Sequence, residues 1–129
     1  MINVNPASFI PIYEQVKKEV RRLVAMGALK AHESLPSIRD LAGELVVNPN
    51  TVARAYRELE QEGLIYTQKG RGCFVSEWDG LRIEKTREAH LCAIFDEAIG
   101  EARRFGLGPP DILKMFDRRL RRFAAEGGK

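Results

Sequence analysis

Residues 37–63, SIRDLAGELVVNPNTVARAYRELEQEG, contain the pattern that decides the fold. Ser37 can cap a helix N-terminus, and Asp40 follows it at the spacing of a capping box. Asn48 offers a second capping acceptor, and Pro49 suits the first position of the helix that follows. We therefore predict two short helices, one on each side of a tight turn, with the second helix ending near residue 62.

The apolar residues of this stretch recur at the offsets that a helix-turn-helix requires. In that motif two helices cross steeply over a short turn, so apolar groups fall at fixed positions and the crossing residue, here Ala42, is small. The apolar positions are filled by Ile38, Leu41, Leu45, Val47, Val52 and Ala55. Val46 departs from the pattern, because its place in the turn favours positive φ, which a β-branched residue disfavours. We expect the turn to differ in detail there.

Two extended runs follow the second helix, at residues 64–68 and 73–76. Gly70-Arg71-Gly72 lies between them, and glycine tolerates the positive φ that a hairpin turn requires. A β-hairpin directly after a helix-turn-helix is a wing. With the amphipathic helix that precedes the motif, the sequence predicts a mainly α fold with a small β-hairpin wing.

One face of the second helix is not used by the predicted core, and its side chains suit DNA. Amides and arginines can read base edges bidentately in a major groove, and short polar groups at a helix N-terminus suit phosphates. The face carries Asn50, Arg54, Arg57 and Gln61, and Thr51 borders it near the N-terminus of the helix. An ordinary solvated face has a similar composition, so the adjoining hairpin decides in favour of DNA. Its tip, which allows close approach to a DNA backbone or minor groove, consists of Lys69, Gly70, Arg71 and Gly72.

Over residues 9–76 the chain resembles the GntR-type winged-helix transcriptional regulators. Four separated motifs agree with that family in order and spacing, and an opening motif at residues 11–16 also matches. The four lie at residues 35–42, 50–60, 62–65 and 70–75. The form of residues 47–51 and the short helical tail resemble the YtrA branch most.

The resemblance implies roles for individual residues. Arg39 matches the family arginine that contacts DNA, and Ser37 stands in the same motif. Asn48 matches the start of the recognition helix, which meets bases and phosphates. The wing tip of relatives enters the minor groove. Arg54 follows the position that usually carries another DNA contact, which is Ala53 in this chain.

The sequence predicts a winged helix-turn-helix domain at residues 1–78, followed by a helical dimerisation tail at residues 79–129. Two helices, at about residues 82–105 and 110–125, carry apolar stripes but cannot alone enclose a pocket of about 300 Å³. A second copy of the chain can bury the stripes in a two-fold interface. The alternative is that they pack on the chain's own winged helix. The predicted dimer interface consists of Leu91, Ile94, Phe95, Ala98, Ile99, Phe105, Phe116 and Leu120.

The charge balance is a weak guide to the partner. The 129 residues include 21 Lys and Arg and 18 Asp and Glu, a net charge of +3, but residues 1–80 hold ten of each sign. A DNA-binding surface must therefore sort its charges in space. We expect the basic groups on the DNA side to be Arg39, Arg54, Lys69 and Arg71. We expect acidic groups to lie elsewhere, among them Glu58, Glu60 and Glu62.

These patterns predict a sequence-specific DNA-binding transcriptional regulator, a repressor, that binds a two-fold operator as a homodimer without a cofactor. No apolar run, secretory signal or disulfide framework occurs, so we expect a cytoplasmic protein that does not enter a membrane. No catalytic grouping or nucleotide fingerprint occurs, so we expect no enzyme.

Three alternatives to a simple DNA-binding regulator stay open. The first is a winged-helix protein-interaction module, although the polar recognition face disfavours it. The second is a metal sensor that uses His90 and Cys92, which are two residues apart on a helix and so point in different directions. The third is a regulator with an unknown small-molecule effector bound between the wing domain and the tail.

Overall fold

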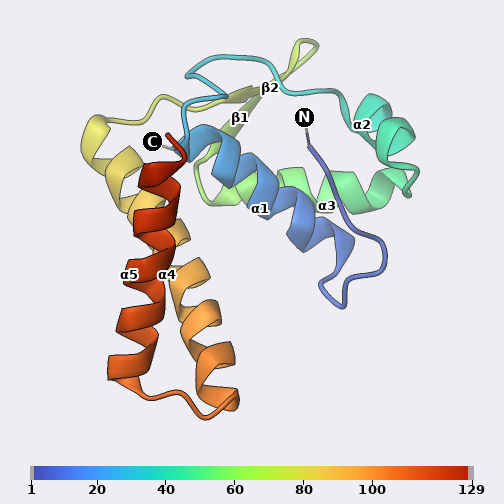
Figure 1. Cartoon of the computed structure of the whole chain (residues 1–129). Helices are drawn as coiled ribbons and strands as arrows, with labels where there is room; N and C mark the ends of the chain where they lie inside the picture. Colours follow the sequence, from blue (N-terminus) through green and yellow to red (C-terminus); the bar gives the residue numbers. More distant parts are fainter. Residues whose placement is uncertain (1, 128–129) are drawn as a thin grey trace. The chain divides into compact units, whose positions relative to one another are not determined.

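The computed structural model describes residues 2–127 and divides the chain into two compact units, which meet in sequence between Glu88 and Ala89. The elements, in chain order, are α1 (Ile12–Ala25), α2 (Ile38–Leu45), α3 (Pro49–Gln61), β1 (Ile65–Gln68), β2 (Gly72–Val75), α4 (Gly80–Arg104) and α5 (Pro109–Ala125) (Figure 1). The prediction of a mainly helical chain with one antiparallel hairpin is confirmed. Among the described residues, none of the helices is long and apolar enough to cross a membrane.

Both central helices begin at the predicted caps. The Oγ of Ser37 accepts a hydrogen bond from the Asp40 N–H at 3.0 Å. The Oδ1 of Asn48 accepts one from the Asn50 N–H at 2.8 Å, and Pro49 is the first residue of α3. Each cap satisfies a backbone donor that the helix itself leaves without a partner.

The turn between α2 and α3 corrects one expectation. Val46 adopts the left-handed conformation, with φ 57° and ψ 53°, so the valine does not change the turn. This geometry lets the Val47 N–H donate to the Ala42 carbonyl at 3.0 Å and lets Val47 pack against the core. The side chain of Val46 is 88% exposed and has room for this conformation. Burial on either side of the turn therefore outweighs the backbone strain, which is about 1–2 kcal/mol for such a residue.

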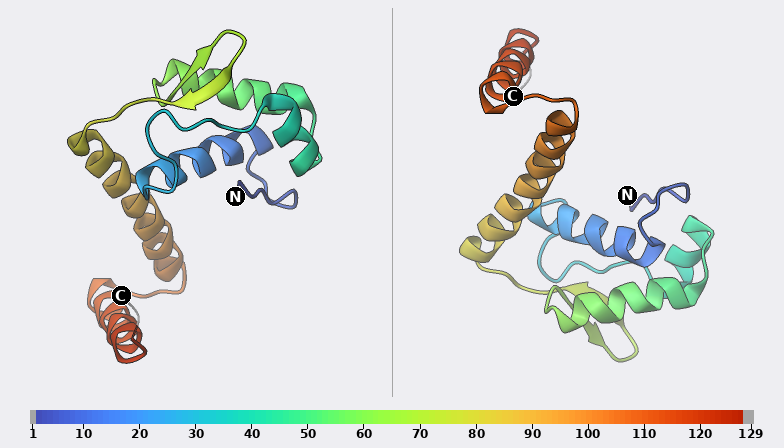
Figure 2. Two further views of the ribbon diagram at one scale, coloured as in Figure 1. Left: turned by 90° about the horizontal axis from the view of Figure 1, so that it is seen from above. Right: turned by 90° about the horizontal axis from the view of Figure 1, so that it is seen from below.

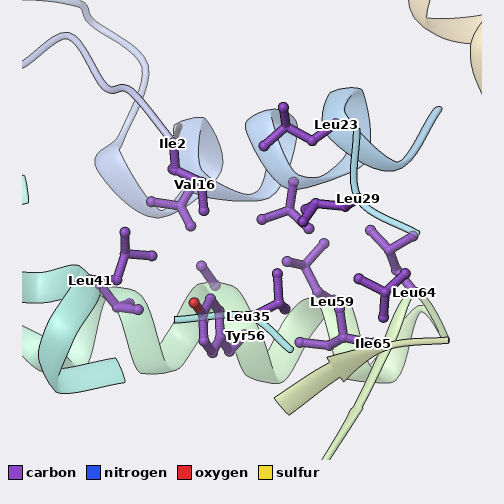
Figure 3. Packing of buried hydrophobic residues seen from close by; sticks show 14 of the residues in the cluster. Ile2, Val16, Leu23, Leu29, Leu35, Leu41, Tyr56, Leu59, Leu64 and Ile65 are labelled. Atoms are coloured by element: carbon purple, nitrogen blue, oxygen red, sulfur yellow. The ribbon is translucent and has the colours of Figure 1, made fainter. Parts of the chain in front are cut away.

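The core of the first unit lies between α1, α3 and the hairpin. Helices α1 and α3 pack side by side, α2 packs against α3, and β1 follows the C-terminal end of α3 (Figures 1 and 2). Leu41, Leu59 and Ile65 come from three of these elements and are almost completely buried (Figure 3). Ile2 also enters the core, beside Val16 of α1.

A third extended segment completes the base of the hairpin. Strands β1 and β2 are antiparallel and pair from Ile65 with Val75 to Gln68 with Gly72. Residues 32–35 run along the other edge of β2, where the His32 N–H donates to the Val75 carbonyl at 2.7 Å. Strand β2 is thus paired on both of its edges at the base of the hairpin, while the tip of the hairpin is exposed.

The first two turns of α4 belong to the first unit. The Arg82 guanidinium donates to the carbonyl of Glu62 at 3.2 Å, and the Arg87 guanidinium donates to the carbonyl of Ala25 at 3.3 Å. These carbonyls lie at the C-terminal ends of α3 and α1, where a positive charge is favourable. The structural division therefore lies within α4, not at residues 78/79, where we predict the functional boundary.

The second unit, residues 89–127, leaves its apolar stripes uncovered. Phe95 of α4 and Phe116 of α5 make an edge-to-face contact, with ring centroids 5.8 Å apart. Both rings are nevertheless close to half exposed, and none of the side chains from residue 89 to residue 127 is buried. Two helices with so little mutual burial do not form a stable core by themselves.

Candidate nucleic-acid interface

The outward face of α3 is polar and accessible, as the sequence predicts. Asn50, Arg57 and Gln61 are exposed, and Thr51 is half-buried at the first turn. The inward side of the same helix is closed by Val52, Ala55, Tyr56 and Leu59. The core thus fixes which side chains point outward, and these carry amide, hydroxyl and guanidinium groups that can bond to base edges.

Two predicted site residues lie at the N-terminus of α2, Ser37 as its N-cap and Arg39 on its first turn. Ser37 and Arg39 are both exposed. The Ser37 oxygen already accepts the capping hydrogen bond, so its hydroxyl is left to act as a donor. The carbonyl oxygen of Asn48 is engaged in the same way, and its NH₂ group is the part available to a ligand. Donors of this kind suit phosphate oxygens.

The hydroxyl of Tyr56 fixes the start of α2 relative to α3. It donates to the carbonyl of Pro36 at 2.7 Å, and burial raises the pKa of this phenol far above its ordinary value. The phenol therefore stays protonated and keeps its donor. This partly buried hydrogen bond joins the segment before Ser37 to the recognition helix.

The wing tip is exposed and has the backbone that its glycines permit. Gly70 and Gly72 have φ values of +81° and +113°, which L side chains rarely adopt. The Arg71 N–H donates to the Gln68 carbonyl at 2.9 Å, which closes the turn. Lys69 and Arg71 therefore project from a tight tip with solvent around them.

Arg54 lies at the border between α3 and α1 and is already engaged within the protein. Its Nε donates to Oε2 of Glu58 at 3.0 Å, and its guanidinium carbon lies 3.7 Å from the centroid of the Tyr13 ring. Half of the Arg54 side chain is still exposed, at 51%. The expectation that Glu58 lies apart from the basic side chains is wrong, because this carboxylate pairs with Arg54 across one helical turn.

Behind Arg54, a cluster of ion pairs joins α1 to α3. Lys17, which is only 7% exposed, places its Nζ 2.8 Å from Glu58 and 3.0 Å from Glu62, and Arg21 also bonds to Glu62. Hydrogen bonds from Lys17 and Arg54 lower the pKa of the Glu58 carboxyl. Burial alone raises the pKa of the Glu62 carboxyl, but hydrogen bonds from Arg21 and Lys17 outweigh it and the net shift is downward. Both carboxylates therefore stay ionised at neutral pH.

The sequence patterns did not assign a role to Tyr13 or Lys17. Both lie on α1, far along the chain from their partners on α3, and no local spacing links them. Glu60 points to the wing instead, where its carboxylate accepts a hydrogen bond from the Thr67 N–H at 3.2 Å. The only available signal was Tyr13 itself, an aromatic residue in the opening motif at residues 11–16.

All side chains of the predicted dimer interface are exposed on α4, α5 and their connection. The exposed fractions of the large apolar members range from 42% for Ile99 to 79% for Phe105. Ala98 is also exposed. They are accessible to a second chain, and the structure contains one chain only.

Comparison with known proteins identifies the family. The family model for bacterial regulatory proteins of the gntR family matches residues 12–75. The chain is 48% identical over 77 residues to the HTH-type transcriptional repressor YtrA of Bacillus subtilis (strain 168), covering 60% of this chain and 59% of YtrA, less than two thirds of that relative. It is 39% identical over 104 residues to the HTH-type transcriptional regulator Rv1152 of Mycobacterium tuberculosis (strain ATCC 25618 / H37Rv), covering 81% of each. Both are regulators of transcription and not enzymes, as predicted.

Solved structures agree with this assignment. A GntR family transcriptional regulator from Listeria monocytogenes has a TM-score of 0.74 and 31% identity, covering 89% of this chain and 98% of that one. The DNA-binding domain of AraR, solved in complex with operator ORX1, has a TM-score of 0.52 and 29% identity, covering 57% of this chain and 92% of that one. The chain belongs to the GntR family of bacterial regulatory proteins, in which the sequence motifs placed it.

Proposed function

We propose that this chain is a sequence-specific transcriptional repressor that binds a two-fold DNA operator through α3, the first turn of α2 and the wing. The observation that carries the proposal is the exposed face of α3, whose Asn50 and Arg57 stand on a helix that the core holds rigidly. The likeness to an AraR DNA-binding domain solved in complex with an operator supports DNA binding by the first unit. The relative YtrA is described as a transcriptional repressor, which supports repression as the effect of binding.

We further propose a homodimer formed by α4 and α5. The support is the uncovered apolar surface of residues 89–127, which includes Phe95, Phe116 and Leu120. A second copy with the same surface can cover it in a self-complementary interface. Two recognition helices related by two-fold symmetry then read two half-sites.

Selection of bound sites from random double-stranded DNA tests the central proposal. A palindromic or near-palindromic motif is the expected result, because a two-fold dimer reads each half-site in opposite orientation. Recovery of no preferred sequence by the full chain contradicts sequence-specific binding. Recovery of a single half-site without a symmetric copy supports sequence-specific DNA binding but contradicts a two-fold operator.

Substitutions on α3 identify the reading residues. Asn50→Ala and Thr51→Ala are each expected to lower affinity for the selected site by about 1–3 kcal/mol per lost base contact. Affinity for unrelated DNA, measured in the same buffer, is the control and is expected to change little. Equal affinities for the selected site in wild type and both variants remove these two residues from the interface.

A cavity of about 310 Å³ in the first unit offers a place for a small-molecule effector. Its apolar walls include Leu29, Trp78 and Ile83, and Arg87 supplies a positive group. The volume falls at the lower end of the range for ligand pockets. We propose this cavity as the effector site of the chain, since a ligand there contacts the start of α4.

A panel of small organic anions in a thermal-shift assay tests the effector site. The expected result is stabilisation by at least one compound that Ile83→Trp abolishes, because the larger ring fills the cavity. An absence of stabilisation across the panel, or equal stabilisation of the variant, contradicts it.

A further inference from the structure

The guanidinium of Arg54 is held on one edge and on one face. Its Nε edge bonds to Glu58 at 3.0 Å, and its plane lies 3.7 Å over the ring of Tyr13. Within the described residues, the two terminal NH₂ groups of Arg54 make no hydrogen bond to the protein. They form the end of the guanidinium that can make two parallel hydrogen bonds to an oxyanion.

The carboxylate that holds Arg54 is itself held. Oε1 of Glu58 bonds to the Lys17 Nζ at 2.8 Å, while Oε2 bonds to Arg54. Lys17 is buried between α1 and α3, so it cannot swing away as an exposed lysine can. The Glu58 carboxylate is thus a fixed support with a different cation on each oxygen.

The charge of this group is compatible with DNA despite its two carboxylates. Lys17, Arg21 and Arg54 carry three positive charges, and Glu58 and Glu62 carry two negative ones. The net charge is positive, and each carboxylate is covered by cations at distances of 3.0 Å or less. Glu58 therefore adds little repulsion toward a nearby phosphate.

We propose that Glu58 and Tyr13 are positioning residues that hold Arg54 ready for a bidentate contact with a DNA backbone phosphate. Arg54 shares the outward face of α3 with Asn50 and Arg57, and it lies on the side of that face where Tyr13 of α1 packs. Arginine contacts to phosphate oxygens fix the register of a protein on the duplex, and a guanidinium whose orientation is already fixed suits the bidentate form of this contact. This inference rests on the proposed DNA binding.

The positioning matters because a free arginine loses rotamer freedom when it binds. The entropy lost on immobilising a long side chain is avoided when contacts within the protein have already fixed its orientation. The position before Arg54, which is Ala53 in this chain, has no group that can bind phosphate. The phosphate contact proposed here is therefore assigned to Arg54.

The test uses four variants of the full chain and the site selected from random DNA. Arg54→Ala is expected to weaken binding roughly tenfold and to reduce the salt dependence by about one released ion. Glu58→Gln is expected to weaken binding severalfold although it removes a negative charge. The double variant is expected to bind no more weakly than Arg54→Ala alone, because Glu58 acts through Arg54. Glu44→Gln on α2 removes the same charge at an exposed position without an ion pair in the described residues, and is the matched control.

The sign of the Glu58→Gln effect decides the question. Affinity equal to or above that of the Glu44→Gln control overturns the proposal, because a mere loss of negative charge strengthens DNA binding. An additive loss in the double variant also overturns it, since a structural role of Glu58 does not require Arg54.

Tyr13→Leu gives a second test if Glu58→Gln fails to fold: a severalfold loss of DNA affinity supports the positioning, and unchanged affinity contradicts it. A wild-type chain that selects no DNA site overturns the proposed function together with this inference, whereas normal wild-type binding with unaffected variants overturns the inference alone.

Discussion

A single residue, Val46, shows how the fold imposes a conformation that its side chain disfavours. Its φ of 57° belongs to the left-handed region, yet the side chain touches little and is 88% exposed. The helix on each side of it is fixed by burial and by the caps at Ser37 and Asn48. The strain at Val46 is therefore a local cost that the neighbouring elements offset.

Val46→Gly is expected to stabilise the chain by about 0.5–1 kcal/mol, since glycine adopts this φ without strain but loses more freedom on folding. Denaturant unfolding of the full chain measures the change. Gly27→Ala is the matched opposite: Gly27 has φ +80° and no atom within 4 Å of an added Cβ, so destabilisation by about 1 kcal/mol is expected from conformation alone. A less stable Val46→Gly variant contradicts the assignment of strain.

At the scale of elements, the ion cluster between α1 and α3 predicts how stability depends on pH. Hydrogen bonds lower the folded-state pKa values of Glu58 and Glu62 below 4.5 and raise that of Lys17 above 10.5. A carboxyl with a lowered pKa stabilises the fold above its unfolded value and loses this contribution as pH falls through the folded value. A lysine with a raised pKa stabilises the fold at pH values below its unfolded-state pKa. It loses this contribution as pH rises through its folded-state pKa.

Lys17→Met tests this cluster by removing the buried charge while keeping the side-chain length. The urea midpoint of the variant is expected to lie below that of wild type at about pH 7, and the difference is expected to shrink as pH falls through the lowered folded-state pKa values of the two carboxyls and both become protonated. Lys18→Met, at an exposed position of the same helix, is the control. A difference between Lys17→Met and wild type that is constant with pH contradicts an electrostatic role.

The wing is a second element with its own prediction. Arg71→Ala is expected to weaken binding to specific and unrelated DNA by similar factors and to reduce the salt dependence by about one ion, because phosphate contacts carry no sequence information directly. Titration of both DNAs over a range of salt concentrations measures this. If Arg71 reads a base instead, the loss is confined to the selected site.

For the whole molecule, the uncovered second unit predicts association. Leu120→Asp, at a position 54% exposed in the single chain, is expected to convert a dimer into a monomer at micromolar concentrations in sedimentation experiments. The reason is that a carboxylate buried in an apolar interface has no partner. Arg119→Asp changes the neighbouring position and is the control. A wild-type chain that sediments as a monomer contradicts the dimer directly.

The sequence predicted local features well and long-range pairings poorly. The caps at Ser37 and Asn48 and the apolar offsets of the helix-turn-helix depend on neighbours a few residues away, so their spacing was sufficient. The stacking of Arg54 on Tyr13 depends on how α1 packs against α3, which no spacing encodes. The conformation of Val46 was mispredicted because its intrinsic preference is overridden by tertiary packing.

The continuity of α4 across the two units has a consequence for amide hydrogen exchange. Its first turns are anchored through Arg82 and Arg87, so the amides of residues 83–88 exchange when the first unit opens, at a rate independent of protein concentration. The amides of residues 89–104 have no buried support in the single chain. With the homodimer proposed above, their protection rises with protein concentration. One uninterrupted helix thus reports two equilibria, the folding of one unit and the association of the other.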